Sequence, residues 1–85
     1  MAVTWVRRIV AFPEHPPQRP EWHCRSCRRE WPCGPRKQQM VRESDGSTMA
    51  ITLPMAGYLA QAYQDLPDEL HGSLYQRFVG WAVRR

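Results

Sequence analysis

The amino-acid sequence predicts a mainly α protein in which a small, metal-clamped N-terminal loop region packs on a C-terminal helical hairpin. Apolar residues recur at helical spacing in the second half of the chain, prolines gather in the first half, and all three cysteines lie among those prolines. A chain of 85 residues is expected to form a single domain, residues 1–85. Its core would be small enough to need a staple such as a bound metal.

The N-terminal part of the chain contains little that predicts a helix. Residues 3–12 are rich in β-branched and aromatic side chains and are compatible with a short strand, although no partner strand is evident. Residues 13–34 contain five prolines, which exclude a regular helix and a central strand. We therefore expect residues 13–34 to form an ordered metal-binding loop, held by something other than secondary structure.

Three helices are expected after this loop, over about residues 35–43, 48–64 and 67–83. Pro35 suits the first position of the first helix, and a Ser-Asp-Gly-Ser turn follows that helix. Pro67 and the acidic residues after it predict the start of the third helix, so that a short link makes the last two helices antiparallel. The expected apolar stripes are Met55, Leu59, Ala62 and Leu66 on the second helix and Leu70, Leu74, Phe78 and Trp81 on the third.

The cysteines predict a metal site. Cys24 and Cys27 form a C-x2-C pair, a turn that points both sulfurs at one ion, and Cys33 is near enough to close the same site. We expect a cytoplasmic protein because no targeting segment is visible, and there such cysteines indicate metal or redox chemistry rather than a disulfide. His15 and His23 are the local candidates for the fourth ligand. His15 is favoured, because His23 adjoins Cys24 and its ring would have to turn sharply to bind the same ion. We expect Zn²⁺ on this set, with an iron–sulfur cluster as the alternative.

The same cysteines allow other interpretations. They could be buried thiols without a metal, a thiol-based redox sensor, or the reactive group of a thiol enzyme or redox carrier. We expect no catalytic activity, because four protein ligands leave no open position on zinc and no Ser/His/Asp grouping or phosphate-binding glycine loop occurs. No small-molecule substrate is evident, and the longest apolar stretch, residues 49–63, is too short to cross a membrane. Three acidic residues are assigned to a helix start: Asp65, Asp68 and Glu69.

The net charge of +4 is concentrated around the cysteines. Between residues 19 and 42, six Arg and one Lys outnumber Glu21 and Glu30. This basic segment could bind a protein or a nucleic acid, with the choice undecided, or it could be a solvated basic face. Trp22 and Trp31 could stack on bases, although such residues more often shield a small metal loop. The candidate partner-binding residues are Arg25, Arg28, Arg29, Arg36 and Lys37, with Arg42 nearby.

Parts of the sequence resemble two known families. The spacing C-x2-C-x5-C is similar to that of the WhiB-like regulators, which carry a four-iron cluster on four cysteines and regulate transcription. A wider resemblance is to a group of small uncharacterised actinobacterial proteins that share a His-Pro, Trp-x-Cys-x-x-Cys and Trp-Pro-Cys pattern. The matching residues here are His15-Pro16, Trp22, Cys24, Cys27, Trp31-Pro32-Cys33 and Arg77-Phe78-Val79-Gly80-Trp81. This second resemblance favours His15 over His23 as the ligand and implies no activity. The sequence thus predicts a non-enzymatic zinc-binding protein that acts through macromolecular contacts, in a regulatory role.

Overall fold

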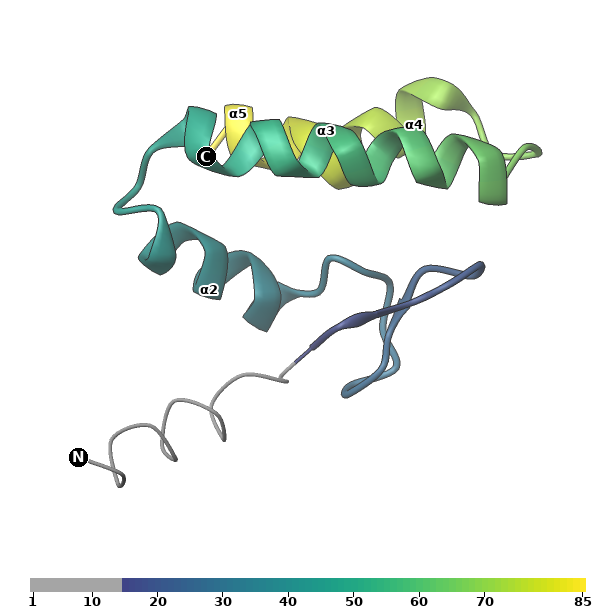
Figure 1. The fold of residues 1–85 in the computed structure, drawn as a ribbon, viewed down its shortest axis with the longest axis horizontal. Coiled ribbons are helices and arrows are strands. Elements are labelled where there is room, and N and C mark those ends of the chain that lie inside the picture. The colour runs from purple at the N-terminus through teal and green to yellow at the C-terminus, as the bar shows by residue number, and fades with distance from the viewer. Residues whose placement is uncertain (1–14) are drawn as a thin grey trace.

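The computed structural model describes residues 15–85, so the strand considered over residues 3–12 lies outside the described residues. The described chain is mainly helical, as predicted. A short β region leads into α2, and α3 and the helix at the C-terminus lie side by side beyond it (Figure 1). This order of elements places the cysteine-containing segment at one end of a helical pair.

The segment before α2 is more regular than predicted. Strand β1 (Pro17–Gln18) pairs antiparallel with β2 (His23–Cys24), with Pro17 opposite Cys24 and Gln18 opposite His23. The backbone N–H of Trp22 donates to the carbonyl of Gln18 at 2.7 Å and closes the turn between them. The sequence did not indicate this pairing, because prolines exclude only a central strand. Each strand here has only two residues and lies at a sheet edge, where a missing N–H is tolerated. We call residues 15–33 the metal loop.

The first two helices begin and end close to the predicted positions. Helix α2 spans Gly34–Glu43, and α3 spans Thr48–Asp65. The Ser47 hydroxyl accepts a hydrogen bond from the N–H of Ala50 at 3.2 Å, which caps the start of α3. Pro54 lies inside α3, on its exposed face. Proline lacks the N–H that would bond to a carbonyl in the preceding turn of the helix. On the exposed face that carbonyl can bond to water instead, so proline destabilises the helix least at such a position.

The last helix begins later than predicted. The elements α4 (His71–Tyr75), η1 (Gln76–Gly80) and α5 (Trp81–Val83) are continuous, because the residues at both joints keep helical dihedral angles. We call residues 71–83 the C-terminal helix. The expected start at residue 67 is wrong, since the N–H of Glu69 donates to the carbonyl of Leu66 at 3.1 Å and Pro67 occupies the second position of that turn. Proline is favoured at this position of a β-turn, and turn formation therefore takes precedence over helix initiation.

This later start changes the apolar stripe of the C-terminal helix. Leu70 precedes the helix and is 75% exposed, whereas Leu74 and Phe78 are buried as expected. The middle turn, η1, is a π-helix, and three successive residues in it, Phe78, Val79 and Gly80, are all buried.

One continuous core joins the metal loop to the helices. Its buried hydrophobic members are Trp22, Cys24, Trp31, Cys33, Met40, Ile51, Met55, Leu59, Ala62, Leu74, Phe78, Val79 and Ala82. The metal loop thus packs on the helical part of the chain, as the sequence predicted. Of the helices in residues 15–85, none has both the length and the apolarity of a membrane span.

Candidate metal centre

The four predicted ligands His15, Cys24, Cys27 and Cys33 lie together. One ligand atom from each residue is within 4.8 Å of those of the other three. Cys24 is on β2, Cys27 is in the turn that follows, and Cys33 immediately precedes α2. The antiparallel turn and the start of a helix therefore bring together residues that are up to 18 positions apart. This cluster could hold a metal ion.

The separations of the ligand atoms fit a single small ion. Nδ1 of His15 lies 3.2 Å from Sγ of Cys24 and 3.4 Å from Sγ of Cys33. With Zn–S bonds of about 2.3 Å and Zn–N bonds of about 2.0–2.1 Å, a tetrahedral site separates a sulfur ligand from a nitrogen ligand by about 3.5 Å. The two measured distances are close to that value, so Nδ1 is the ring nitrogen of His15 that faces the site.

The backbone of His15 adopts an uncommon conformation at this site. Its φ angle is 63°, in the left-handed region that favours glycine. Its N–H donates to the hydroxyl of Ser26 at 3.0 Å, and its carbonyl accepts from the indole N–H of Trp31 at 2.9 Å. Contacts from both sides of the metal loop therefore fix the histidine in a conformation that a free chain would rarely adopt.

His23 is not part of the cluster. It is adjacent to Cys24 on β2, and successive side chains of a strand point to opposite faces. Cys24 is completely buried and His23 is exposed, in agreement with that alternation. The structure therefore selects His15 from the two candidates.

Backbone hydrogen bonds shape the C-x2-C turn. The N–H of Cys27 donates to Sγ of Cys24 at 3.4 Å, and the N–H of Arg28 donates to the carbonyl of Cys24 at 2.9 Å. The N–H of Cys24 in turn donates to the carbonyl of Arg29 at 2.6 Å. These bonds hold the first two sulfurs on one side of the turn and supply a donor to a thiolate, which supports metal binding.

The pKa values of two ligand thiols shift in opposite directions. Burial acts to raise the pKa of Cys24, but hydrogen bonds from the amide of Cys27 and from His15 outweigh it, and the pKa is about 6. Burial raises the pKa of Cys33 to about 11, against the amide of Arg36, and the neighbouring Cys24 adds to that rise. The site therefore stabilises one thiolate with its own donors but resists a second. A divalent cation bound here would supply the positive charge that allows both to ionise.

Two tryptophans dock the metal loop on the helices. Trp22 and Trp31 are 0% and 1% exposed, and their ring centroids are 5.8 Å apart. Trp22 packs edge-on against Phe78 at 5.3 Å, and Trp31 packs edge-on against Tyr58 at 5.1 Å. Edge-to-face contacts of this kind stabilise a core beyond the burial of area alone. Both tryptophans are buried in the core, as a shielding role would require, and neither is accessible for stacking on a base.

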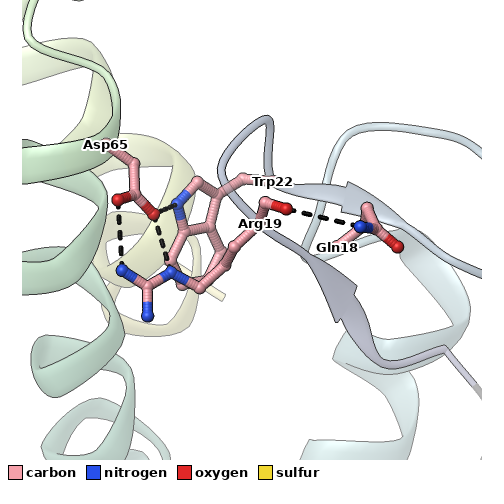
Figure 2. A network of polar contacts seen from close by, with 4 residues as sticks. All are labelled: Gln18, Arg19, Trp22 and Asp65. Carbon is pink, nitrogen blue, oxygen red and sulfur yellow. Dashed lines mark hydrogen bonds and ion pairs between the residues drawn. The ribbon is translucent and has the colours of Figure 1, made fainter.

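Asp65 joins the metal loop to the end of α3, a role that the sequence did not predict (Figure 2). Its carboxylate accepts from the indole N–H of Trp22 at 2.8 Å and from Nε and Nη2 of Arg19 at 2.7 and 3.1 Å. The hydrogen bond from Arg19 lowers the pKa of Asp65. The expected helix-start role is wrong because Asp65 is the last residue of α3. Its partners lie 43 and 46 positions earlier in the chain, and no local pattern indicated them.

Arg77 makes the second polar link between the two regions. From the π-helical turn, its guanidinium donates to the carbonyls of Trp22 and Trp31, at 2.5 and 2.8 Å, and lies 3.4 Å from the carboxylate of Glu30. Its side chain is only 14% exposed. Burial lowers the pKa of Arg77, against the charges of Glu30 and Glu69. No local pattern of residues predicted this role. The only indication was that Arg77 belongs to the pattern that resembles the small actinobacterial proteins.

The predicted basic residues are divided among different parts of the surface. The structure places them beside three separate hollows, bordered by Arg25 and Arg28, by Arg36, and by Lys37 and Arg42. Arg36 donates to Oε1 of Gln39 at 2.6 Å, and Nζ of Lys37 lies 5.5 Å from the ring centroid of Trp81. Arg25, Arg28 and Arg29 are clustered at the C-x2-C turn, and all three are exposed. The arginines of this turn are therefore the basic group closest to the candidate metal centre.

The chain matches no protein-family model, no curated protein and no solved structure. The two resemblances noted in the sequence stay predictions.

Proposed function

We propose that this chain is a non-enzymatic zinc-binding module that acts through contacts with a macromolecule, in a regulatory role. The observation that carries the proposal is the set of four ligand atoms from His15, Cys24, Cys27 and Cys33, all within 4.8 Å of one another. One nitrogen and three sulfurs form a ligand set typical of structural zinc.

The compactness of the cluster supports a single ion over an iron–sulfur cluster. In a cluster, several iron and sulfide atoms separate the protein ligands, so those ligands must be farther apart than around one ion. Here a separation of 4.8 Å is the upper limit, and the S···N distances are 3.2 and 3.4 Å. Among single ions, soft thiolates with one imidazole select zinc over magnesium, calcium or manganese.

The burial of two of the four ligands supports a structural role over a catalytic one. Cys24 and Cys33 are 0% and 3% exposed, and four protein ligands complete a tetrahedral zinc site. The low pKa of Cys24, about 6, would suit a nucleophile, but a thiolate with no exposed surface cannot meet a substrate. The low pKa is better matched to metal binding, because a thiolate is the form that binds zinc.

Zinc also explains how a segment with little secondary structure stays ordered. Structural zinc sites contribute about 10–16 kcal/mol of apparent binding free energy, and a domain of this size has a total stability of about 5–15 kcal/mol. The two-residue strands of the metal loop could not supply a comparable contribution. What the folded loop leaves on the surface is an arginine-rich turn, and this supports a role in contacting a macromolecule.

The test is native mass spectrometry with metal analysis of anaerobically purified protein. We expect one zinc per chain and no visible absorbance. The variants His15→Ala and Cys33→Ser should lose most of the zinc, and His23→Ala, the matched control, should keep it. Iron with inorganic sulfide, or a metal-free folded protein, would overturn the proposal.

A further inference from the structure

We propose that the arginine-rich turn beside the metal centre binds the phosphate backbone of duplex nucleic acid. The binding surface is a hollow next to Cys24, together with the exposed guanidinium group of Arg29. This inference rests on the proposed zinc-binding function, since the metal ligands fix the turn that carries the arginines.

The hollow has the lining that an anion requires. Its volume is about 360 Å³, and the residues that border it are Gln18, His23, Cys24, Arg25 and Arg28. The side chains of four of them, all except Cys24, carry nitrogen atoms that can donate hydrogen bonds. Among residues 15–85, no carboxylate borders it. Guanidinium groups bind phosphate through paired hydrogen bonds, so two of them at one hollow favour a phosphate oxygen over a neutral ligand.

Among the described residues, the arginines at this turn differ from most of the other arginines in having no internal partner. Within residues 15–85, Arg19, Arg36, Arg77, Arg84 and Arg85 each donate a side-chain hydrogen bond to another residue. In the same part of the chain, no side-chain hydrogen bond or ion pair involves Arg25, Arg28, Arg29 or Arg42. Three of these four unpaired guanidinium groups therefore lie within five residues of one another, where they can meet an external anion.

Nearby charges leave the turn positive. Zinc with three thiolates and a neutral imidazole carries one net negative charge, which three guanidinium groups outweigh. Glu30 lies 3.4 Å from Arg77 and is therefore already paired. Glu21 is exposed on the preceding turn and does not border the hollow. The field at the hollow therefore attracts anions.

The burial of the tryptophans decides which part of a nucleic acid the turn can contact. Proteins that bind single strands stack bases on exposed aromatic rings. Trp22 and Trp31 flank the cysteines but are 0% and 1% exposed, and no aromatic residue from the described part of the chain borders the hollow. The available contacts are therefore with phosphates, which do not depend on base sequence. Phosphates are denser along a duplex than along a single strand, which favours the duplex.

The experiment measures fluorescence anisotropy of a labelled, mixed-sequence DNA duplex titrated with zinc-loaded full-length protein at several salt concentrations. We expect binding at low salt that weakens steeply as salt rises. The combined variant Arg25→Gln, Arg28→Gln, Arg29→Gln should bind about tenfold more weakly or worse, with the log–log salt slope reduced by about one unit for each arginine removed.

Arg42→Gln is the matched control, because Arg42 is unpaired within the described residues but lies on α2, beside another hollow. Its affinity should stay within about twofold of the unchanged protein, since it loses a charge elsewhere on the surface. Zinc occupancy of every variant is measured in parallel by native mass spectrometry. Absence of zinc would refute the proposed function itself. Three results at full zinc occupancy would overturn this inference alone. They are no duplex binding at low salt, an equal loss of affinity in the control variant, and clearly tighter binding to a single strand.

Discussion

The metal loop and the helical pair formed by α3 and the C-terminal helix share one core, but different contacts hold them. The buried hydrophobic residues of the metal loop are two tryptophans and two cysteines. Those of the helical pair are mostly aliphatic, such as Ile51, Leu59 and Leu74, and lie on amphipathic helices. Apolar burial can explain why the helices are ordered, but it explains only part of the order of the loop. We propose that the remaining stabilisation of the loop comes from a bound metal and from polar links.

The two regions also depend on each other. The apolar faces of the helical pair are completed by the rings of Trp22 and Trp31, which contact Phe78 and Tyr58. The metal loop is in turn bonded to the helices by Asp65 and Arg77. A two-helix hairpin of this length buries too little on its own to be stable, so we expect the loop and the helices to fold as one unit.

Removal of the metal should have the largest effect. A strong chelator is expected to abolish the fixed environment of the tryptophans and to reduce the helical signal with it, because the lost binding energy of about 10–16 kcal/mol is as large as the stability of a small domain. Near-ultraviolet circular dichroism reports on the tryptophans, and far-ultraviolet circular dichroism reports on the helices. If the helical signal survives unchanged after the tryptophan signal is lost, the two regions fold independently.

Truncation of a docking ring should be the next most damaging change. Trp31→Ala removes a side chain that is 1% exposed and leaves a cavity between the metal loop and α3, at a cost of about 3–5 kcal/mol. Tyr75→Ala, at a position on the C-terminal helix that is 40% exposed, should change the free energy of unfolding by less than about 0.5 kcal/mol. Denaturant unfolding of the zinc-loaded proteins measures both. A cost for Trp31→Ala no greater than that of Tyr75→Ala would show that the ring does not hold the regions together.

Loss of the Arg77 link should cost less than loss of a ring. Arg77→Met keeps the apolar stem but leaves the carbonyls of Trp22 and Trp31 without this donor, for an expected cost of about 2–3 kcal/mol. The matched change Arg42→Met, at an exposed arginine without a bonded partner among the described residues, should be nearly neutral. Thermal unfolding of both variants distinguishes them. Equal melting temperatures would mean that Arg77 contributes no net stabilisation.

The ion pair of Asp65 should contribute less, because its partner Arg19 has a side chain that is 48% exposed to solvent. Asp65→Asn removes the charge that Arg19 pairs with, while the shape of the side chain is kept. The pKa of Asp65 is lowered by Arg19, so the carboxylate stabilises the fold above its ordinary pKa of 3.8, and at pH 7 this contribution is present in full. We expect the melting temperature at pH 7 to fall by a few degrees. Asp68→Asn, in the adjacent turn, should leave it unchanged, and a fall of the same size there would point to general charge effects.

Most of the features predicted from the sequence depend on neighbouring residues. The exception is the grouping of His15 with Cys33, 18 positions apart, which followed from the number of ligands that a zinc site requires. Cys24 and Cys27 belong to one turn, and the apolar positions of α3 repeat along a single helix, so local spacing was sufficient for both. The links from Asp65 to Trp22 and from Arg77 to Trp31 join residues that are 43 and 46 positions apart and follow no local pattern. The prediction that Leu70 belongs to the apolar stripe of the last helix is wrong for a related reason. Its exposure depends on the turn at Pro67, and the helical spacing of the apolar residues did not indicate that turn.

The smallest expected effect gives the sharpest test of the coupling. Gly57 lies on the exposed side of α3, and a Cβ added there would meet no atom within 4 Å. Gly57→Ala should stabilise α3 by up to about 1 kcal/mol, because alanine loses less backbone entropy than glycine in a helix. The substitution adds no contact to the metal loop. If the loop and the helices fold as one unit, zinc can leave only when the whole protein unfolds. Gly57→Ala should then slow the loss of zinc to a chelator, because it stabilises the folded protein. A higher melting temperature with an unchanged rate of zinc loss would instead show that the loop opens by itself, while the helices behind it stay folded.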